Sequence, residues 1–185
     1  EFERASTTVA NAYVRPIMRR YLEDLASKLR EAGMTASEPL IMTSDGGTIP
    51  CATAAKYPVR LIESGPAGGA MAAAFLGGLS NHSDLIAFDM GGTTAKICII
   101  EDGTPSRVGT FEVGHVYRFA RGSGLPIRAP VLEMIEIGAG GGSVAQVSAL
   151  GLLKVGPESS GAEPGPACYR RGGNAATVTD ADLYL

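Results

Sequence analysis

The residues best suited to chemistry lie at the end of an apolar run in the middle of the chain. Leu85-Ile86-Ala87-Phe88 is followed at once by Asp89-Met90-Gly91-Gly92-Thr93-Thr94. Two glycines let backbone N–H groups approach phosphate oxygens, threonine hydroxyls add donors, and a strand-end carboxylate can hold Mg²⁺ or orient a water. The same residues would also suit a glycine-stabilised β-turn. Since the stretch is neither a Walker A loop nor G-x-G-x-x-G, the residues alone leave both interpretations open.

Two further glycine-rich segments are candidates for binding an anion. Glu63-Ser64-Gly65-Pro66-Ala67-Gly68-Gly69-Ala70 enters a predicted helix, and helix N-termini attract anions. The alternative is that its small residues let the helix cross a neighbour tightly. Ile137-Gly138-Ala139-Gly140-Gly141-Gly142-Ser143 contains four glycines in five residues, which cost unusually much entropy to order. This run is therefore either a cradle for phosphate or substrate, or a bulged turn.

The cysteines and histidines give a weaker signal. Cys168 stands in a long loop rich in Gly and Pro, and such loops tend to be functional. No base stands beside it, and no ligand spacing accompanies His82 or His115, so a cysteine nucleophile and a histidine metal site are both disfavoured. The cysteines are odd in number and lack C-x-x-C spacing, which is typical of reduced thiols in a cytoplasmic protein. They are Cys51, Cys98 and Cys168.

Composition narrows the class of protein. The chain has 185 residues, of which 45% are hydrophobic and 19% charged, as expected of a globular protein that buries a core. A net charge of −3 argues against a broad nucleic-acid surface. Residues 64–83 carry no Asp, Glu, Lys or Arg, but they are mostly small, so they predict a helix packed against protein and not a membrane span.

The first part of the chain has helical periodicity. Apolar residues recur at three- and four-residue spacing over residues 5–32, which predicts a long amphipathic helix that Pro16 kinks or splits and Gly33 ends. After it we expect shorter elements: a strand at 40–43, a helix at 52–56, a strand at 59–62 and a helix of small residues at 67–76.

From Asp84 onward the sequence predicts mainly β-strands. Strands are predicted at 85–88, 95–100 and 107–113, and their short connections make them antiparallel neighbours. A further strand is predicted at 131–137, a long loop at 156–174, and a helix that starts at 179–182. The sequence thus predicts a mixed α/β fold in which the Asp89 segment follows a buried strand.

Six blocks in this order resemble the hydantoinase A/5-oxoprolinase family. Together they span nearly the whole chain, which makes the resemblance far more specific than any one glycine run. The blocks are residues 3–13 (ERASTTVANAY), 44–47 (SDGG), 64–69 (SGPAGG), 89–93 (DMGGT), 138–143 (GAGGGS) and 165–181, which begins GPACY and ends TVTDA.

The resemblance implies an actin-like ATPase fold made of two RNase H-like lobes, with ATP and Mg²⁺ bound between them. Residues 1–83 would be the C-terminal part of the first lobe with the interlobe helix, and residues 84–185 the truncated N-terminal part of the second. Strand 59–62 would then be the last strand of the first lobe. Because the family's first D-x-G-G-T motif is not present, we expect the chain to be an internal fragment that is inactive by itself.

The resemblance also implies roles for residues. Asp89 would serve Mg²⁺, through water, or the attacking water. Gly140, Gly141, Gly142 and Ser143 would form a wall of the active cleft. The residues implied to bind the phosphates of ATP are Gly91, Gly92, Thr93, Thr94, Gly65 and Gly68.

The activity implied is ATP-dependent opening of a cyclic amide of the hydantoin or 5-oxoproline type, in the cytoplasm, with a second, hydantoinase B-like subunit or domain. The alternatives are a subunit of an ATP-dependent ketone carboxylase, acting on acetone or acetophenone, and a non-catalytic actin-like scaffold. Two departures from the family pattern bear on this choice. Lys96 stands where the family commonly has Asp, and Glu133-Met134-Ile135 stands where it often has Asp-x-His.

Overall fold

The computed structural model describes residues 1–35, 38–114 and 122–185. The chain divides into two compact units, each described by itself. The first unit comprises Glu1–Leu85 and Ile99–Glu133, and the second Ile86–Cys98 and Met134–Leu185. The lobe boundary predicted after residue 83 concerns the family's ATPase lobes and stays a prediction.

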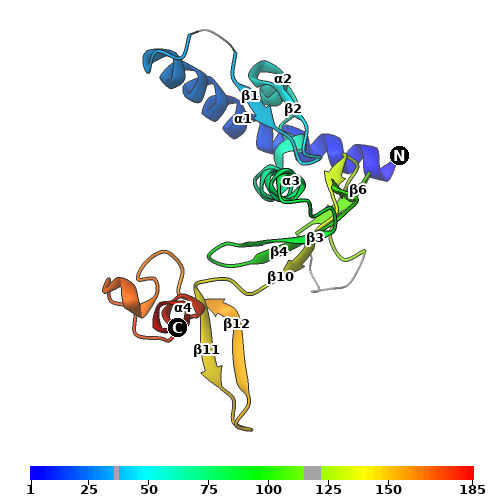
Figure 1. Ribbon diagram of the computed structural model, residues 1–185. Helices are drawn as coiled ribbons and strands as arrows, with labels where there is room; N and C mark the ends of the chain where they lie inside the picture. Colours follow the sequence, from blue (N-terminus) through cyan, green and yellow to red (C-terminus); the bar gives the residue numbers. More distant parts are fainter. Residues whose placement is uncertain (36–37, 115–121) are drawn as a thin grey trace. The chain divides into compact units, whose positions relative to one another are not determined.

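A single long helix, α1 (Phe2–Glu31), opens the first unit (Figure 1). The predicted helix is confirmed, but it is not split at Pro16, because the loss of one backbone donor leaves the hydrogen bonds of the neighbouring turns in place. Leu22 is 1% exposed and packs with Cys51 and Ala54. The helix ends before Gly33, which adopts a positive φ of 86°.

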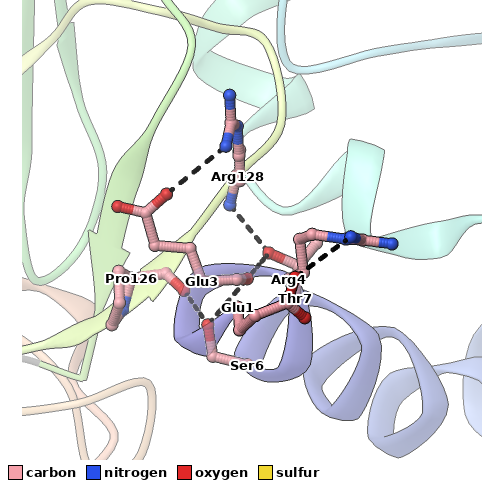
Figure 2. Close-up of polar contacts among 7 residues, drawn as sticks. All are labelled: Glu1, Glu3, Arg4, Ser6, Thr7, Pro126 and Arg128. Atoms are coloured by element: carbon pink, nitrogen blue, oxygen red, sulfur yellow. Dashed lines mark hydrogen bonds and ion pairs between the residues drawn. The ribbon is translucent and has the colours of Figure 1, made fainter.

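The first turns of α1 are fixed by polar contacts with β8 (Leu125–Ile127) and the residue after it (Figure 2). The Ser6 hydroxyl donates to the Pro126 carbonyl, and the Arg128 N–H donates to Thr7 Oγ1 at 2.8 Å. Arg128 also lies 3.7 Å from the Glu3 carboxylate. Two segments more than 100 residues apart in sequence are thereby joined.

Short elements follow α1. Strands β1 (Leu40–Met42) and β2 (Thr48–Pro50) pair antiparallel, and α2 (Cys51–Lys56) comes next. The strand predicted at 59–62 is wrong: Pro58–Leu61 forms a 3-10 helix. Its Arg60 carbonyl accepts from the N–H and the hydroxyl of Ser44, both at 2.7 Å, in place of a strand ladder. Helix α3 (Ser64–Leu79) then begins three residues earlier and ends three residues later than predicted.

One sheet has the strand order β10-β4-β3, and β5 (Thr104–Pro105) also pairs with β4. Strands β3 (Leu85–Met90) and β4 (Ala95–Glu101) are neighbours joined by a four-residue turn, as predicted. On the other side of β4, β10 (Ile135–Ile137) pairs antiparallel, so that Glu136 faces Lys96.

The strands predicted at 107–113 and 131–137 are each divided, and the first does not join the β3–β4 sheet. Strand β6 (Arg107–Val108) pairs with β9 (Val131–Leu132), whereas β7 (Phe111–Val113) pairs with β8. Each apolar run thus changes partner part-way along, at 109–110 and at 133–134, which its hydrophobicity alone does not reveal.

The second unit also contains a hairpin and a short helix. Strands β11 (Ser143–Val147) and β12 (Leu153–Ser159) pair antiparallel, with a bulge between Ser143 and Ala145 (Figure 1). Strand β12 takes up the start of the loop predicted at 156–174, and a 3-10 helix lies at Ala167–Tyr169. Helix α4 (Val178–Tyr184) begins one residue before the predicted start. None of the helices in the described ranges is both long and apolar enough to cross a membrane.

Candidate functional site

The turn after β3 presents exposed polar groups. Asp89 is exposed, and its carboxylate has no hydrogen-bond or ion-pair partner among the described residues. Gly91, Gly92 and Thr93 are exposed as well, and the Gly91 N–H closes the turn by donating to the Thr94 carbonyl at 2.9 Å. The carboxylate that the sequence singles out is therefore accessible and not sealed in the core.

The glycine run at 140–142 donates backbone hydrogen bonds to the carbonyl groups of this turn. The Gly141 N–H donates to the Gly91 carbonyl at 2.9 Å, and the Gly142 N–H donates to the Gly92 carbonyl at 2.8 Å. A Cβ on Gly140 would lie 2.6 Å from both the Gly91 oxygen and the Thr93 nitrogen, so only glycine fits there. The structure thus brings together two of the three glycine-rich segments selected from the sequence.

These contacts determine which way the turn's N–H groups face. A trans peptide unit directs its N–H opposite to its C=O. Because the carbonyls of Gly91 and Gly92 accept from the glycine run, the N–H groups of Gly92 and Thr93 are directed away from it. Within the described part of the chain neither N–H has an acceptor. Two exposed backbone donors in a turn that follows a strand-end carboxylate are the kinds of group that bind a phosphate and its Mg²⁺.

Neither packing nor backbone conformation requires glycine at positions 91 and 92 of this turn. A Cβ on Gly92 would meet nothing within 4 Å, and one on Gly91 would make only an ordinary contact of 3.6 Å with the Thr94 oxygen. Neither glycine has a positive φ. The fold would therefore tolerate side chains at both positions, and bare backbone here would allow another molecule to approach closely.

The residues predicted to form a cleft wall have an observed internal task. Gly140, Gly142 and Ser143 are buried, and the Ser143 hydroxyl accepts the Gly140 N–H at 2.9 Å. Gly141 is partly exposed. In this unit the run supports the turn from behind, and its contact with a substrate stays a prediction.

The start of α4 joins the same cluster, which the sequence analysis missed. Thr179 donates its N–H and its hydroxyl to the Gly141 carbonyl, both at 2.8 Å. Thr177 caps the helix, and its hydroxyl and N–H each donate to Asp180 at 2.8 Å. The capping-box pattern of Thr three residues before an acid was the available signal.

Asp180 also binds the loop that carries Cys168. The Cys168 N–H donates to Asp180 at 2.7 Å. This bond, together with those from Thr177 and the Cys168 thiol, holds the pKa of Asp180 well below its usual range. In turn, the hydrogen bond to Asp180, some burial and the carboxylate's charge raise the pKa of the Cys168 thiol. A neutral thiol is a poor nucleophile, so the structure argues against a catalytic role for Cys168.

The third glycine-rich segment lies in the first unit, at the start of α3. Gly65 is exposed and a Cβ on it would meet nothing within 4 Å, while the nearest atom to a Cβ on Gly68 is Met42 Cγ at 4.0 Å. Tight helix crossing, the alternative interpretation, does not explain these two glycines. At Gly77 the need for glycine has another cause, because a Cβ there would collide with Leu85 Cδ2 and lie 2.8 Å from the His82 carbonyl oxygen, both in the segment that follows the helix.

The SDGG turn at 44–47 has a structural role within the first unit. Ser44 is fully buried, and its carbonyl accepts the Leu132 N–H at 2.8 Å. Partial burial opposes ionisation of Asp45, but hydrogen bonds from the Thr43 hydroxyl and the Gly47 N–H outweigh it and leave the pKa of Asp45 below its usual range. A Cβ on Gly46 would lie 2.8 Å from Met71.

Asp89 is the candidate for a metal ligand among the described residues. Among the described residues no group of three or more His, Cys, Asp or Glu side chains could hold a metal ion, and His115 lies outside those residues. Mg²⁺ is commonly bound by one or two carboxylates together with substrate phosphates. A single accessible carboxylate, Asp89, fits that mode of binding.

Comparison with known proteins identifies relatives along the whole chain. The model of the Hydantoinase/oxoprolinase family matches residues 4–185. An uncharacterized protein of Methanocaldococcus jannaschii is 43% identical over 100% of this chain and 28% of its own length. Caprolactamase subunit alpha of Pseudomonas jessenii is 38% identical over 100% of this chain and 25% of its own. For 5-oxoprolinase of Saccharomyces cerevisiae the identity is 37%, over 98% of this chain and 13% of the relative.

Two solved structures resemble the chain over its full length. A nucleotide-free structure of acetone carboxylase, an enzyme of ATP-dependent acetone carboxylation, superposes with a TM-score of 0.75 at 28% identity, and the match covers 24% of that chain. The crystal structure of the ATP-dependent caprolactamase from Pseudomonas jessenii gives a TM-score of 0.71 at 36% identity and 25% coverage. The present chain therefore spans about a quarter or less of most of these proteins, and it belongs to the hydantoinase/oxoprolinase family.

Proposed function

We propose that this chain is part of an ATP-dependent enzyme that opens cyclic amides, and that the turn at 91–94 binds the phosphates of ATP. The observation that carries the proposal is the exposed turn itself, whose unpaired Gly92 and Thr93 N–H groups follow the exposed, unpartnered Asp89 by three and four residues in the chain. The names of the relatives, 5-oxoprolinase and caprolactamase, support the substrate class.

In this proposal each group has a defined task. The Gly92 and Thr93 N–H groups and the hydroxyls of Thr93 and Thr94 donate to phosphate oxygens, and Asp89 holds Mg²⁺ through water or orients the attacking water. Mg²⁺, when bound with ATP, neutralises charge on the phosphates. Gly65 and Gly68 offer a second place of close approach to the nucleotide at the start of α3.

Phosphorylation makes the ring amide reactive. The γ-phosphoryl group moves from ATP to the amide carbonyl oxygen, and ADP leaves. Water then adds to the activated carbon, and the ring C–N bond breaks as its nitrogen gains a proton. A second water hydrolyses the resulting acyl phosphate to a carboxylate and phosphate. ATP is used because amide resonance otherwise makes the ring resistant to water.

We further assign the fold to the actin-like ATPases, with residues 1–83 and 84–185 in successive lobes. The similarity to two ATP-dependent enzymes supports this assignment. We also propose that the protein acts in the cytoplasm. A second, hydantoinase B-like subunit is proposed as its partner, because relatives are named as subunits of larger enzymes.

A ketone carboxylase is the second candidate, favoured by the TM-score of 0.75 to acetone carboxylase. A scaffold role has less support, since Lys96 lies opposite Glu136 and so has a structural explanation as a cross-strand pair of opposite charge. A scaffold would bind ATP without hydrolysing it.

The test is substrate-stimulated phosphate release by the full-length protein. We expect a hydantoin, 5-oxoproline or a lactam to stimulate release without bicarbonate. Stimulation only by a ketone with bicarbonate would favour the carboxylase, and tight ATP binding without release under any condition would favour the scaffold.

A further inference from the structure

Helix α4 reaches the turn after β3 through a short relay of hydrogen bonds. Thr179 donates its N–H and its hydroxyl to the Gly141 carbonyl, both at 2.8 Å. Gly141 donates its own N–H to the Gly91 carbonyl at 2.9 Å. One residue thus separates Thr179 from the turn, and all three residues belong to the second unit.

A parallel relay holds the next residue of the turn. Ser160 donates its N–H to the Gly142 carbonyl at 2.8 Å, and Gly142 donates to the Gly92 carbonyl at 2.8 Å. Since each bound carbonyl fixes its peptide plane, the relays orient the N–H groups of Gly92 and Thr93. The direction of these donors is therefore determined by residues that do not themselves belong to the turn.

Thr179 is held rigidly enough to act in this way. Its neighbours Thr177 and Asp180 form a reciprocal capping box, and Thr177 is 2% exposed. The fit against the glycine run is close, because a Cβ on Gly141 would lie 2.8 Å from Thr179 Oγ1. The hydroxyl thus meets Gly141 without room for another carbon.

We propose that Thr179 is a positioning residue for the turn at 91–94. Its hydroxyl fixes Gly141, so that the Gly92 and Thr93 N–H groups face the nucleotide. This inference rests on the proposed function of the turn. Thr179 touches neither nucleotide nor metal in the proposal, and it acts through Gly141 alone.

The test compares Thr179→Val with Thr179→Ser in the full-length enzyme. Valine keeps the size of the side chain and the backbone bond to Gly141 but removes the hydroxyl, whereas serine restores it. We expect valine to raise KM for ATP or lower kcat by roughly two- to tenfold, the factor for one neutral hydrogen bond, and serine to stay near the wild type. Thr8→Val is the matched control, because its hydroxyl also donates to a carbonyl at 2.8 Å, on α1.

A second variant covers the case in which Thr179→Val does not fold. Gly141→Ala places a carbon against the Thr179 hydroxyl while leaving an ordinary 3.8 Å contact with the Gly91 oxygen. It should displace the hydroxyl and produce the same change in KM or kcat. Hydrogen exchange gives an independent readout, since the Gly141 and Gly142 amides should exchange faster in Thr179→Val than in the wild type.

The outcomes separate this inference from the function on which it rests. If Asp89→Ala abolishes ATP turnover but both Thr179→Val and Gly141→Ala keep wild-type KM and kcat, the positioning role is overturned. A lower melting temperature with unchanged KM and kcat would mark a purely structural role and overturn it as well. If Asp89→Ala leaves turnover unchanged, the proposed function itself fails, and the positioning role fails with it.

Discussion

At the scale of single residues, two kinds of glycine in this chain bear on the candidate site. The fold itself requires glycine at some positions: Gly46 has a positive φ of 80°, and a Cβ on Gly77 or Gly140 would collide with backbone atoms at 2.8 Å or less. Gly65 and Gly92 have open space where a Cβ would lie and no positive φ. Contacts within the fold do not require glycine at positions of the second kind, and for Gly65 and Gly92 we propose that the bare backbone serves close approach of the nucleotide.

Gly65→Ala tests this division. Alanine has the higher helix propensity, but its Cβ precedes the ring of Pro66, which disfavours the helical conformation of the residue before it, so the two effects on the stability of α3 oppose each other. We expect the melting temperature of the full-length enzyme to change little while KM for ATP increases. Gly78→Ala is the control, since this glycine is also exposed on α3 with nothing within 4 Å of a Cβ. Equal ATP kinetics for the two variants would remove Gly65 from the site.

The reactivity of Cys168 tests the contact with Asp180. Because the carboxylate raises the pKa of the thiol, Cys168 should react slowly with iodoacetamide at neutral pH. Asp180→Asn removes the charge, so alkylation should become faster. Mass spectrometry of Cys168 gives the rate, and the buried Cys51 and Cys98 serve as internal references. Equal rates in the two proteins would contradict the contact.

At the scale of elements, the capping box of α4 predicts a dependence on pH. The pKa of Asp180 in the folded protein lies below the unfolded value of about 3.9. The ionised carboxylate therefore contributes its full stabilisation of the folded state above that pH, and this contribution is lost as the pH falls toward the folded pKa. We expect the denaturant midpoint of the second unit to drop between about pH 5 and pH 2. Asp180→Asn should be less stable at neutral pH and show a flatter profile, and an unchanged slope would argue against this assignment.

Elements with strong local signals could be predicted from the sequence, and those chosen by their partners could not. The periodicity of α1, the apolar run of β3 and the turn before β4 were evident locally. The segment 59–62 is apolar enough for a strand, but Pro58 and the bonds from Ser44 to Arg60 make it a 3-10 helix. The runs at 107–113 and 131–137 divide where their strands change sheets, which only tertiary pairing determines.

The candidate site shows the same division. The sequence indicated Asp89 and the glycine-rich segments, because their residue types are unusual for mere connection. It could not indicate that the run at 140–142 is hydrogen-bonded to the turn at 91–94, since these bonds join backbone atoms that all residues share. The part played by Thr179 was missed for a related reason: its hydroxyl acts on a carbonyl, and a threonine in a helix start is common.

At the scale of the whole molecule, the chain spans only 28% and 25% of the first two relatives compared. Its turn offers a few phosphate donors, and we propose that the remaining contacts to ATP come from other parts of the enzyme. The 185-residue chain by itself should therefore bind ATP weakly in calorimetry. A dissociation constant near 1 μM, about −8 kcal/mol, would contradict this prediction, since so few hydrogen bonds do not supply that energy.

The central claim is that Asp89 and the turn after it serve ATP. The most direct measurement is ATP turnover by the full-length enzyme carrying Asp89→Ala, with Asp24→Ala as a control of equal charge change at an exposed position on α1. We predict that Asp89→Ala lowers turnover by at least about 100-fold, the scale of losing one electrostatic group in the transition state, with an unchanged melting temperature. Turnover equal to that of the Asp24→Ala control would contradict the account.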